Sequence, residues 1–489
     1  MKKRKKIVLC HGVFDVVHSG HINYLKKAKQ LGDILVVSVT SDNYVNKGPG
    51  RPVFNINQRI NFLTELKLVD RVYESNDYTA EKIIEKIRPD IYCKGIDYSD
   101  KKKIKNDRNL LKEIKSLKKC GGKFIAVKEK KFSSSKLINQ NSLLNLSRKN
   151  IDYIKSIKKY TSLSGINKDL KKIKKLKALV IGEMIIDNYI FIDPVGKSGK
   201  EPILIYKKKN ENKFIGGTGY ISNLISSFVD SVYLITCVGE KKDELNFIKK
   251  NLNNSIKFNY VLKKNSPTII KTRYLDSYKN NKIMGIYKIN DELISGIEEK
   301  KIIDKLKKLV KKCDLIILAD YGHGFMTKSI RNYLQKFKKK LFLNTQINSF
   351  NRGFHTLSNY KSANCIVFNE SELRHEMRDQ TSGLDRLIKK LKNKIKSQHI
   401  IVTQGRFGST HFVKNKKYYC PAFSDSAIDS TGAGDTFFSL ASLGLSAKIN
   451  YKLMNLISSI ASGYSVNNLT NKKYYNRQLL NRHLNYMLE

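Results

Sequence analysis

Short apolar runs alternate with stretches of helical periodicity along the first part of the chain. Residues 7–10 and 34–39 are apolar runs typical of buried strands, and residues 22–31 between them have the spacing of a helix with outward lysines. The further predicted elements are helices at 80–87 and 109–118 and strands at 91–93 and 124–127. Because strands that alternate with helices form a parallel sheet covered on both faces, we predict an α/β domain over residues 1–140.

A second α/β region follows a segment of different composition. Residues 141–176 are rich in Lys, Ser and Asn and have weak helical periodicity, which is typical of a linker. Strand-like runs then recur at 178–181, 231–237, 315–318, 340–343, 365–368 and 399–402. We predict a second α/β domain over residues 177–489. Residues 189–214 contain strand-like segments without an intervening helix, which indicates a small β-lid over this domain.

The apolar runs are too short for a membrane span or a secretion signal. No run reaches the roughly 18 apolar residues that a spanning helix needs, and the one after the Lys-rich start covers only residues 7–10. The seven cysteines are scattered without a CxxC pair, unlike a disulfide framework or a zinc site. We therefore expect a cytoplasmic protein with reduced thiols and no membrane partner.

The charge is strongly positive, with 93 Lys and Arg residues against 43 Asp and Glu, a formal net charge of +50. The lysines are spread along nearly the whole chain, beside many Asn and Ile residues and no Trp. A nucleic-acid-binding protein usually concentrates its charge on one face or tail. We interpret the charge as a product of codon usage and expect no specific nucleic-acid partner. The positive field can still help to recruit anionic, phosphorylated substrates.

The first candidate chemistry is His18-Ser19-Gly20-His21, where the first predicted strand gives way to a helix. Phosphates bind at such junctions in open α/β sheets, because free backbone N–H groups and the helix dipole face the crevice. Two histidines three residues apart can donate hydrogen bonds to an α-phosphoryl group as charge develops on it. The alternative is a pair of packing or surface histidines.

This stretch resembles the HxGH signature of the cytidylyltransferase-like nucleotidyltransferases, a Rossmann-like family. Other blocks agree with that family in order: Ser41-Asp42, Lys47-Gly48, Arg51-Pro52, Gln58-Arg59, residues 94–98 and residues 133–138. The resemblance covers roughly residues 5–140. The order of these blocks and the residues within them are similar to those in the adenylyltransferase half of the bifunctional ADP-heptose synthesis enzymes. One departure is Ser133-Ser134-Ser135, where the family often has Ser-Thr-Thr; the hydroxyl groups are retained.

The resemblance implies attack of a sugar-phosphate oxygen on the α-phosphorus of a nucleoside triphosphate, with release of pyrophosphate. It implies catalytic roles for His18, His21 and Lys47, and phosphate contacts for Arg51 and Arg59. The nucleotide-binding residues that it implies are Gly12, Phe14, Asp15, Gly20, Lys94, Gly95, Asp97, Ser134 and Ser135.

The second candidate chemistry is Asp429-Ser430-Thr431-Gly432-Ala433-Gly434-Asp435, just before an apolar helical stretch at 437–445. Glycines at a helix start let backbone N–H groups close on a transferring phosphoryl group. A carboxylate just inside that turn can accept a proton from a substrate hydroxyl. A lone glycine turn often only caps a helix, but the full motif resembles that of the ribokinase-like (PfkB) sugar kinases.

That resemblance covers residues 178–470 and implies a ribokinase-like α/β domain with Asp435 as the base. For the nucleotide and the anion hole it implies Thr403, Gly405, Gly408, Thr431, Gly432, Ala433 and Gly434. For the sugar it implies Asp187, Gly216, Gly217, Lys271 and Arg273, and for Mg²⁺, through water, Asn369 and Glu372. Within the family, the blocks around Pro202, Pro267 and Asp320 are most similar to heptose-7-phosphate kinases.

Some positions depart from the kinase pattern. Thr218-Gly219-Tyr220 replaces small residues and an Asn, and Asn344-Thr345-Gln346 replaces an Asp-Pro-Lys. His323 stands where heptose kinases tend to have Lys. These changes fall on the sugar and nucleotide surroundings, so they put the identity of the sugar in doubt. The nucleotidyltransferase-like region also comes first, the reverse of the usual heptose fusion.

Together these patterns predict a bifunctional, Mg²⁺-dependent enzyme that activates a sugar for surface glycan synthesis. We expect ATP-dependent phosphorylation of a sugar phosphate, with heptose 7-phosphate at O1 as the leading candidate, and nucleotidyl transfer to a sugar 1-phosphate. ATP is the expected nucleotide, with CTP possible at the N-terminal site, and a homo-oligomer is expected. One alternative keeps both chemistries on another sugar or polyol with CTP. Another keeps the nucleotidyltransferase and makes the kinase half a non-catalytic sugar sensor.

Overall fold

The computed structural model describes residues 4–45, 52–95, 107–127, 146–424, 427–468 and 474–488. Contacts divide the chain into a first unit, Met1–Asn145 with Arg482–Glu489, and a second unit, Leu146–Asn481. Among the described helices, none is long and apolar enough to cross a membrane.

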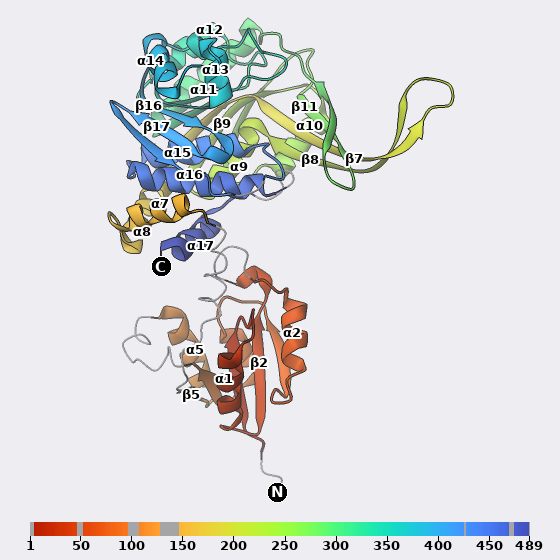
Figure 1. The fold of residues 1–489 in the computed structure, drawn as a ribbon, viewed down its shortest axis with the longest axis vertical. Helices are drawn as coiled ribbons and strands as arrows, with labels where there is room; N and C mark the ends of the chain where they lie inside the picture. The colour runs from red at the N-terminus through yellow and green to blue at the C-terminus, as the bar shows by residue number, and fades with distance from the viewer. Residues whose placement is uncertain are drawn as a thin grey trace. The chain divides into compact units, whose positions relative to one another are not determined.

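The first unit is built on a parallel five-stranded sheet with the order β3-β2-β1-β4-β5 (Figure 1). Its elements are β1 (Ile7–Gly12), α1 (Ser19–Lys29), β2 (Ile34–Thr40), α2 (Ile56–Thr64), β3 (Arg71–Ser75), α3 (Glu81–Ile87), β4 (Ile91–Lys94), α5 (Arg108–Lys119) and β5 (Lys123–Ala126). The strand order reverses between β1 and β4, so the carboxyl ends of these two strands open the crevice where ligands bind in such sheets.

Helices cover both faces of this sheet. Leu25 of α1 and Leu63 of α2 pack with Val37 on one face, while Ile84 of α3 and Leu117 of α5 pack on the other. The predicted α/β class of this domain is confirmed. Neither α2 nor β3 is predicted from the sequence, because α2 is short and β3 is a partly exposed edge strand with few apolar residues.

The second unit contains a nine-stranded sheet with the order β10-β9-β6-β13-β14-β15-β16-β17-β18. Its strands are β6 (Lys177–Gly182), β9 (Ser231–Val238), β10 (Ile256–Leu262), β13 (Leu315–Asp320), β14 (Leu341–Thr345), β15 (Ser362–Asn369), β16 (Lys396–Thr403), β17 (Ser409–Val413) and β18 (Lys416–Cys420). The strands from β10 to β16 are parallel, and only β17 and β18 pair antiparallel. The carboxyl ends of the parallel strands therefore share one edge, where a site can form.

Helices cover this sheet on both faces as well (Figure 1). The helices are α9 (Gly217–Ser226), α10 (Lys242–Asn251), α11 (Gly296–Leu309), α12 (Lys328–Gln335), α13 (Glu370–Met377), α14 (Leu384–Lys394), α15 (Ala433–Ser446) and α16 (Tyr451–Val466). The last helix, α17 (Arg477–Leu488), is divided between the two units after Asn481. One buried cluster joins the apolar sides of α11, α12, α13 and α14 to the sheet. The helices α9, α15 and α16 contact the same sheet and are apolar nearly all round, as fully buried helices are.

A separate four-stranded sheet forms the predicted lid. Its order is β12-β11-β7-β8, from β7 (Met184–Lys197), β8 (Leu204–Gly216), β11 (Ile269–Asp276) and β12 (Lys282–Lys288). The far part of the β7–β8 hairpin extends as an arm away from the rest of the second unit (Figure 1). The predicted α/β class of this unit and its β-lid are confirmed.

The segment predicted as a linker contains two helices, α7 (Arg148–Lys158) and α8 (Leu163–Lys174). They belong to the second unit. The Asn150 side chain donates a hydrogen bond to the carbonyl of Ala422, and the Tyr153 hydroxyl donates one to the carbonyl of Lys452. The weak periodicity seen in the sequence therefore corresponds to two capped helices that pack on the rest of the second unit.

Candidate active sites

The two predicted histidines lie side by side at the start of α1. His18 is the N-cap residue, and its Nδ1 accepts a hydrogen bond from the backbone N–H of Gly20 at 3.1 Å. The ring centroids of His18 and His21 are 4.0 Å apart, and the Phe14 ring lies 5.5 Å from that of His21. This places both imidazoles at a helix N-terminus, where the free N–H groups and the dipole favour an anion.

The loop that leads into α1 has a fixed and unusual backbone. Phe14 has a φ of 47°, in the left-handed region that bulky residues seldom adopt. A Cβ at Gly12, where β1 ends, would lie 3.2 Å from the Phe14 ring, so the glycine leaves room for this turn. Asp15 is buried, and its carboxylate accepts hydrogen bonds from the N–H groups of Val53 and Phe54. The structure thus gives Asp15, predicted to bind nucleotide, two backbone partners in the next loop.

Arg59 is buried and holds the same two loops together. Its Nη1 donates to the carbonyl of Val13 at 2.5 Å, its Nε to that of Phe54 at 2.9 Å, and its Nη2 to Oδ1 of Asp42 at 2.6 Å. The arginine is only 2% exposed, so its donors are used within the protein. Arg59, which the sequence analysis offered for phosphate contacts, therefore shapes the loops around the histidines instead of facing an open phosphate site.

Lys94 is the last residue of β4 and Gly95 follows it, beside the end of β1. The ammonium of Lys94 lies 3.7 Å from a carboxylate oxygen of Glu113 and 5.3 Å from the centroid of the Tyr92 ring. Burial, together with the charge of Lys94, lowers the pKa of His11 to about 3. A neutral His11 therefore stands at the end of β1, a neighbour of the site that the sequence analysis did not single out.

Other residues predicted for this site, Lys47, Asp97, Ser134 and Ser135, and also Arg51, lie outside the described residues. The described part of the site therefore consists of the two histidines, the loop of Gly12, Phe14 and Asp15, Gly20 within α1, and the pair Lys94 and Gly95.

In the second unit, Asp435 lies in the first turn of α15. The Tyr321 hydroxyl, from just after β13, donates a hydrogen bond to its Oδ1 at 3.0 Å. Burial raises the pKa of Asp435 to about 6, and the hydrogen bond from Tyr321 opposes that rise. A carboxylate with a pKa near 6 is mostly ionised at neutral pH and can accept a proton from a substrate hydroxyl.

The predicted anion-hole turn leads directly into this helix. Gly432 is the N-cap residue and has a φ of 79°, a conformation that glycine adopts without strain. Gly434 is exposed, and a Cβ placed on it would meet nothing within 4 Å. The backbone N–H groups at the start of α15 therefore lie where a phosphoryl group can approach them.

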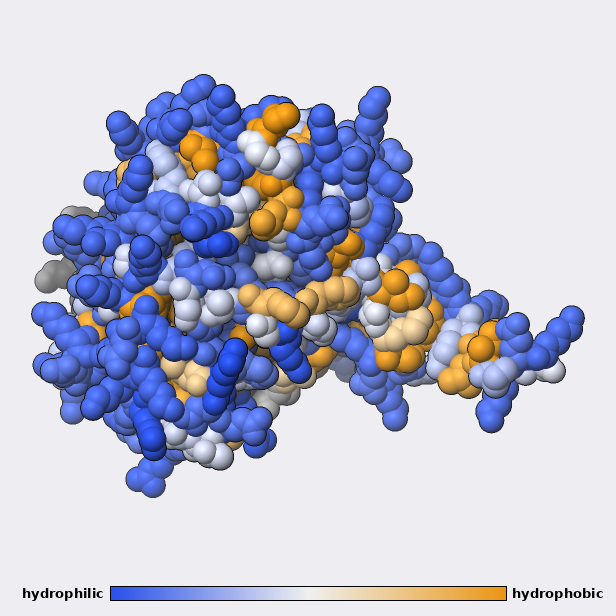
Figure 2. Space-filling view, turned by 90° about the horizontal axis from the view of Figure 1, so that it is seen from above, coloured by the Kyte–Doolittle hydropathy of each residue, from blue (hydrophilic) through white to orange (hydrophobic). Residues whose placement is uncertain are grey.

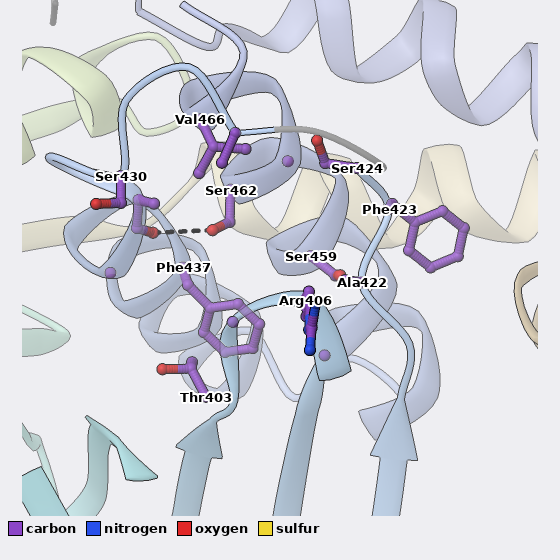
Figure 3. A pocket seen from close by; sticks show the side chains of 16 residues that line it. Thr403, Arg406, Ala422, Phe423, Ser424, Ser430, Phe437, Ser459, Ser462 and Val466 are labelled. Carbon is purple, nitrogen blue, oxygen red and sulfur yellow. Dashed lines mark hydrogen bonds between the residues drawn. The ribbon is translucent and has the colours of Figure 1, made fainter. Parts of the chain in front are cut away.

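A pocket of about 380 Å³ opens beside this turn (Figure 3). It brings together five of the residues predicted for the nucleotide, and Phe437 adds an aromatic ring to its wall. The predicted residues in the lining are Thr403, Gly405, Gly408, Ala433 and Gly434. Most of the remaining lining residues belong to no motif in the sequence; they include Ala422, Phe423, Ser459 and Ser462. A mostly apolar pocket next to an anion site has the character expected for a nucleotide base and its phosphates.

Turn geometry explains the glycines in this lining. Gly405 and Gly408 have φ values of 55° and 89°. A Cβ on Gly408 would overlap the carbonyl oxygen of Cys420. The N–H of Gln404 also closes the turn onto the carbonyl of Gly408 at 2.7 Å. Glycine is therefore needed for the chain to turn back after β16.

The residues predicted for the sugar come together where the lid sheet meets the main sheet. Asp187 on β7 and Arg273 on β11 form an ion pair at 2.6 Å, with both side chains largely buried. A Cβ on Gly216 would overlap the Asp187 carboxylate, and one on Gly217 would lie 2.6 Å from the carbonyl oxygen of Glu183. The two glycines thus make room for the carboxylate and for the start of α9.

Lys271 lies on the same strand as Arg273 and is 7% exposed. Its ammonium is 6.0 Å from the centroid of the Tyr321 ring and 5.9 Å from that of Tyr287. Burial lowers its pKa, although the nearby charge of Asp187 acts in the opposite direction. A cation thus lies near the Asp435–Tyr321 pair, as recognition of an anionic sugar would require.

Asn369 and Glu372 supply the oxygen atoms that Mg²⁺ prefers, but both are engaged in the cap of α13. The Asn369 side chain accepts from the N–H of Glu372, and the Glu372 carboxylate accepts from the N–H of Asn369, each at 2.8 Å. Burial raises the pKa of Glu372 to about 7. Among the described residues, no group of three or more His, Cys, Asp or Glu could hold a metal. The pair therefore fits a magnesium ion only through water, as the resemblance implies.

The positions that depart from the kinase pattern have structural partners. The Tyr220 hydroxyl is 2.7 Å from Oγ1 of Thr436, which donates to the carbonyl of Gly432. The Asn344 side chain donates to the carbonyl of Val367 on the neighbouring strand. Nδ1 of His323 lies 2.7 Å from Asp291, and burial lowers the pKa of His323 to about 4. Tyr220 thus supports the turn before Asp435.

Glu183 is a functional candidate whose role the sequence analysis missed. It follows β6, is fully buried, and accepts hydrogen bonds from the N–H groups of Tyr321 and His323, each at 3.0 Å. Burial and the neighbouring Asp320 raise its pKa to about 7. A carboxylate at the end of a buried strand was the only sequence signal, and its partners are more than a hundred residues away.

Comparison with known families and structures assigns both units. A model of the cytidylyltransferase-like family matches residues 9–141, and a model of the pfkB family carbohydrate kinases matches residues 175–458. The solved ribokinase from Giardia lamblia covers 64% of this chain and 99% of its own, with a TM-score of 0.51 and 16% identity. Ribokinase from Thermotoga maritima covers 63% of this chain and 99% of its own, with a TM-score of 0.50 and 20% identity. At these identities the likeness shows the fold alone.

Curated relatives match the chain in part. Bifunctional protein HldE of a Nitratiruptor species is 26% identical over 296 residues, which are 60% of this chain and 62% of that relative. Bifunctional protein HldE of Campylobacter jejuni subsp. doylei is 47% identical over 102 residues, 20% of this chain and 22% of the relative. The chain thus spans at most 62% of the length of either relative.

Proposed function

The chain belongs to the pfkB family of carbohydrate kinases and has a cytidylyltransferase-like N-terminal domain, and from this premise we propose that it activates a sugar in two chemical steps. The second unit phosphorylates a sugar phosphate, and the first joins a sugar 1-phosphate to a nucleotide. The position of Asp435 carries the proposal. It lies in the same helical turn as Gly434, which lines the pocket, and its charge interacts with those of Asp187 and Lys271 on the sugar side.

In the kinase step, a hydroxyl oxygen of the sugar attacks the γ-phosphorus of ATP. A new O–P bond forms, the bond between the γ-phosphorus and the β–γ bridging oxygen breaks, and ADP leaves. The hydroxyl proton passes to the carboxylate of Asp435. The N–H groups of the turn from Gly432 to Gly434 stabilise the phosphoryl oxygens as charge shifts toward ADP. When bound, Mg²⁺ would neutralise phosphate charge, held through water by Asn369 and Glu372.

In the nucleotidyl step, a phosphate oxygen of the sugar 1-phosphate attacks the α-phosphorus of the nucleoside triphosphate. A new P–O bond forms, and pyrophosphate leaves as the bond to the β-phosphate breaks. His18 and His21 donate hydrogen bonds to the α-phosphoryl oxygens at the N-terminus of α1. Lys47, Ser134, Ser135 and Asp97 complete the site in this proposal, with Lys94 and Gly95 beside the nucleotide.

We propose a heptose 7-phosphate as the kinase substrate, phosphorylated at O1, and ATP as the nucleotide at both sites. The motif resemblance supports this choice, and the matches to proteins named Bifunctional protein HldE agree with paired activities. A separate phosphatase must then act between the two steps, because the kinase product carries two phosphates. The product would feed surface glycan synthesis in the cytoplasm. The alternatives are another sugar or polyol with CTP, and a kinase unit that only senses sugar phosphates.

One experiment separates these possibilities. The purified chain is incubated with ATP or CTP and a panel of sugar phosphates, and pyrophosphate and ADP are followed separately. His18→Ala should abolish only pyrophosphate release, and Asp435→Asn should abolish only ADP release. A chain that releases pyrophosphate but never ADP with any sugar phosphate would support the sensor. Loss of both signals in either variant would contradict two independent sites.

A further inference from the structure

Asp429, which opens the loop before the predicted anion hole, is held by residues of the lid sheet. Its side chain is 1% exposed. Oδ1 accepts from the ammonium of Lys282 at 2.7 Å, and Oδ2 accepts from the Tyr189 hydroxyl at 3.1 Å. Lys282 begins β12 and Tyr189 lies on β7, so two lid strands contact one carboxylate. We call Lys282, Tyr189 and Asp429 the lid latch.

The latch continues into the turn that leads to α15. The N–H of Thr431 donates to the same Oδ1 of Asp429 at 2.9 Å, and the ammonium of Lys282 also donates to Oγ1 of Thr431 at 3.0 Å. Thr431 is followed directly by Gly432, whose left-handed backbone starts α15. Lys282 therefore holds two residues of the chain, Asp429 and Thr431, just before the N–H groups of the turn.

The same lid strands carry the sugar-side residues. The guanidinium of Arg273 lies 5.5 Å from the centroid of the Tyr189 ring and pairs with Asp187 at 2.6 Å. Although burial acts to raise the pKa of Asp429, the bonds from Lys282 and Thr431 outweigh it and lower that pKa. Asp429 is therefore an anion that the lid neutralises, and a displaced lid would leave its charge buried without its cationic partner.

We propose that Lys282 and Tyr189 are positioning residues of the kinase site. By binding Asp429 they set the backbone of the anion-hole turn, so the turn is correctly arranged only when β7 and β12 of the lid are in place. Asp187 and Arg273 also lie on lid strands, so a sugar bound to them holds the lid in place. The lid in turn keeps the anion-hole turn in the conformation that stabilises the phosphoryl group. This inference rests on the proposed kinase function. A small displacement of such a turn can slow the reaction by as much as about 100-fold.

Lys282→Met tests the latch, because it removes the ammonium and keeps most of the side-chain volume. We expect kcat for ADP release to fall by about 10-fold or more, with a smaller change in KM for ATP. Lys282→Arg should restore most of the rate, since a guanidinium can donate to the same oxygens. The matched control is Lys288→Met at the other end of β12, whose ammonium pairs with Glu244 instead.

A double-mutant cycle shows whether the effect passes through Asp429. Lys282→Met should lower kcat for ADP release much less in the Asp429→Asn background than in the unaltered chain. In that background residue 429, the partner of Lys282, carries no charge. Additive losses of rate would overturn the proposal, and so would an unchanged kcat in Lys282→Met. The unfolding midpoint of each variant shows that the unit is still folded.

A measurement without turnover separates this inference from the proposed function. In Lys282→Met, hydrogen exchange at the backbone N–H of Thr431 should be faster than in Lys288→Met. Equal protection in the two variants would contradict the latch whether or not the enzyme is active. A chain that releases no ADP, but in which only Lys282→Met loses this protection, would refute the kinase proposal and leave the latch supported.

Discussion

At the scale of single residues, the kinase-like site depends on groups that fix the direction and protonation of Asp435. Tyr321 donates to its carboxylate, and the buried Glu183 holds the backbone N–H of Tyr321. In the first unit, Arg59 and Asp15 play a similar part by joining the loops around the histidines. In both units, polar residues next to the proposed catalytic groups shape the site without themselves reacting.

The pH dependence of the kinase reaction should depend on the hydrogen bond from Tyr321 to Asp435. Asp435 must be ionised to accept a proton, so kcat/KM for ADP release should fall as the pH drops through about 6. Tyr321→Phe removes a hydrogen bond that lowers the pKa of Asp435, so the acid limb should move to higher pH. The loss of rate should be larger at pH 6 than at pH 8. Tyr333→Phe on α12, whose ring packs on Phe337, is the control. An unmoved acid limb in Tyr321→Phe would contradict the role of this bond.

Gly216→Ala tests the sugar-side ion pair. The added Cβ would overlap the carboxylate of Asp187 and push it from Arg273. We expect KM for the sugar phosphate to rise by about 10-fold or more, in line with the loss of one charge-assisted contact, while KM for ATP changes little. Gly199→Ala, in the β7–β8 hairpin loop, is the control, since its Cβ meets nothing within 4 Å. Equal effects on the two KM values would argue against a sugar-side role.

At the scale of helices and strands, the sequence predicted most of the central strands because they are continuous apolar runs. Fewer of the helices and strands that are half exposed to solvent could be predicted from the sequence. The short helix α2, the edge strand β3 and the lid strands β11 and β12 carry mixed polar and apolar residues. Their places are set by partners in the sheet and by caps such as that of Asn55 on α2, which local periodicity does not reveal.

A buried histidine pair between β16 and β17 should make stability depend on pH. Nδ1 of His399 lies 3.1 Å from Nε2 of His411, and Tyr451 of α16 covers both rings. Burial lowers the pKa of His399 to about 4 and that of His411 to about 3, whereas an unfolded chain titrates near 6.5. The unfolded state therefore binds more protons below about pH 6.5, and stability should fall from there toward about pH 4.

His411→Phe should make this loss of stability shallower, because one of the two protons is no longer taken up on unfolding. The measurement is the urea midpoint between pH 7 and pH 4.5, compared with the unaltered chain. His375→Gln, at an exposed position on α13, is the control and should follow the unaltered chain. A slope in His411→Phe equal to that of the unaltered chain would show that the pair does not govern this range.

At the scale of the whole molecule, the lid sheet exposes a group of large apolar side chains. Orange residues gather on its arm in Figure 2. Val195 and Leu204 of the β7–β8 hairpin are 66% and 61% exposed, and Ile283, Met284 and Ile286 of the edge strand β12 are between 43% and 56% exposed. An exposed apolar edge strand is a ready template for pairing with another chain. We therefore expect the proposed homo-oligomer to form through the lid.

Ile283→Lys combined with Ile286→Lys should lower the oligomeric state, because charges on an edge strand oppose pairing. Light scattering coupled to size-exclusion chromatography measures the mass in solution. The control is Leu293→Lys, also an exposed apolar position but outside the lid sheet. A monomeric unaltered chain at micromolar concentration, or an oligomer that the double variant leaves intact, would show that the lid is not the interface.

The sequence by itself determined the two α/β units and the places of His18, His21 and Asp435, because strand runs and motif spacing are local properties of the chain. Tertiary structure alone decided the partners of these groups. Asp187 meets Arg273 across 86 residues, Tyr321 meets Glu183 across 138, and Lys282 meets Asp429 across 147. Whether a lysine on a strand faces solvent or a buried carboxylate depends on which strands and loops the fold brings beside it. No local pattern encodes that choice.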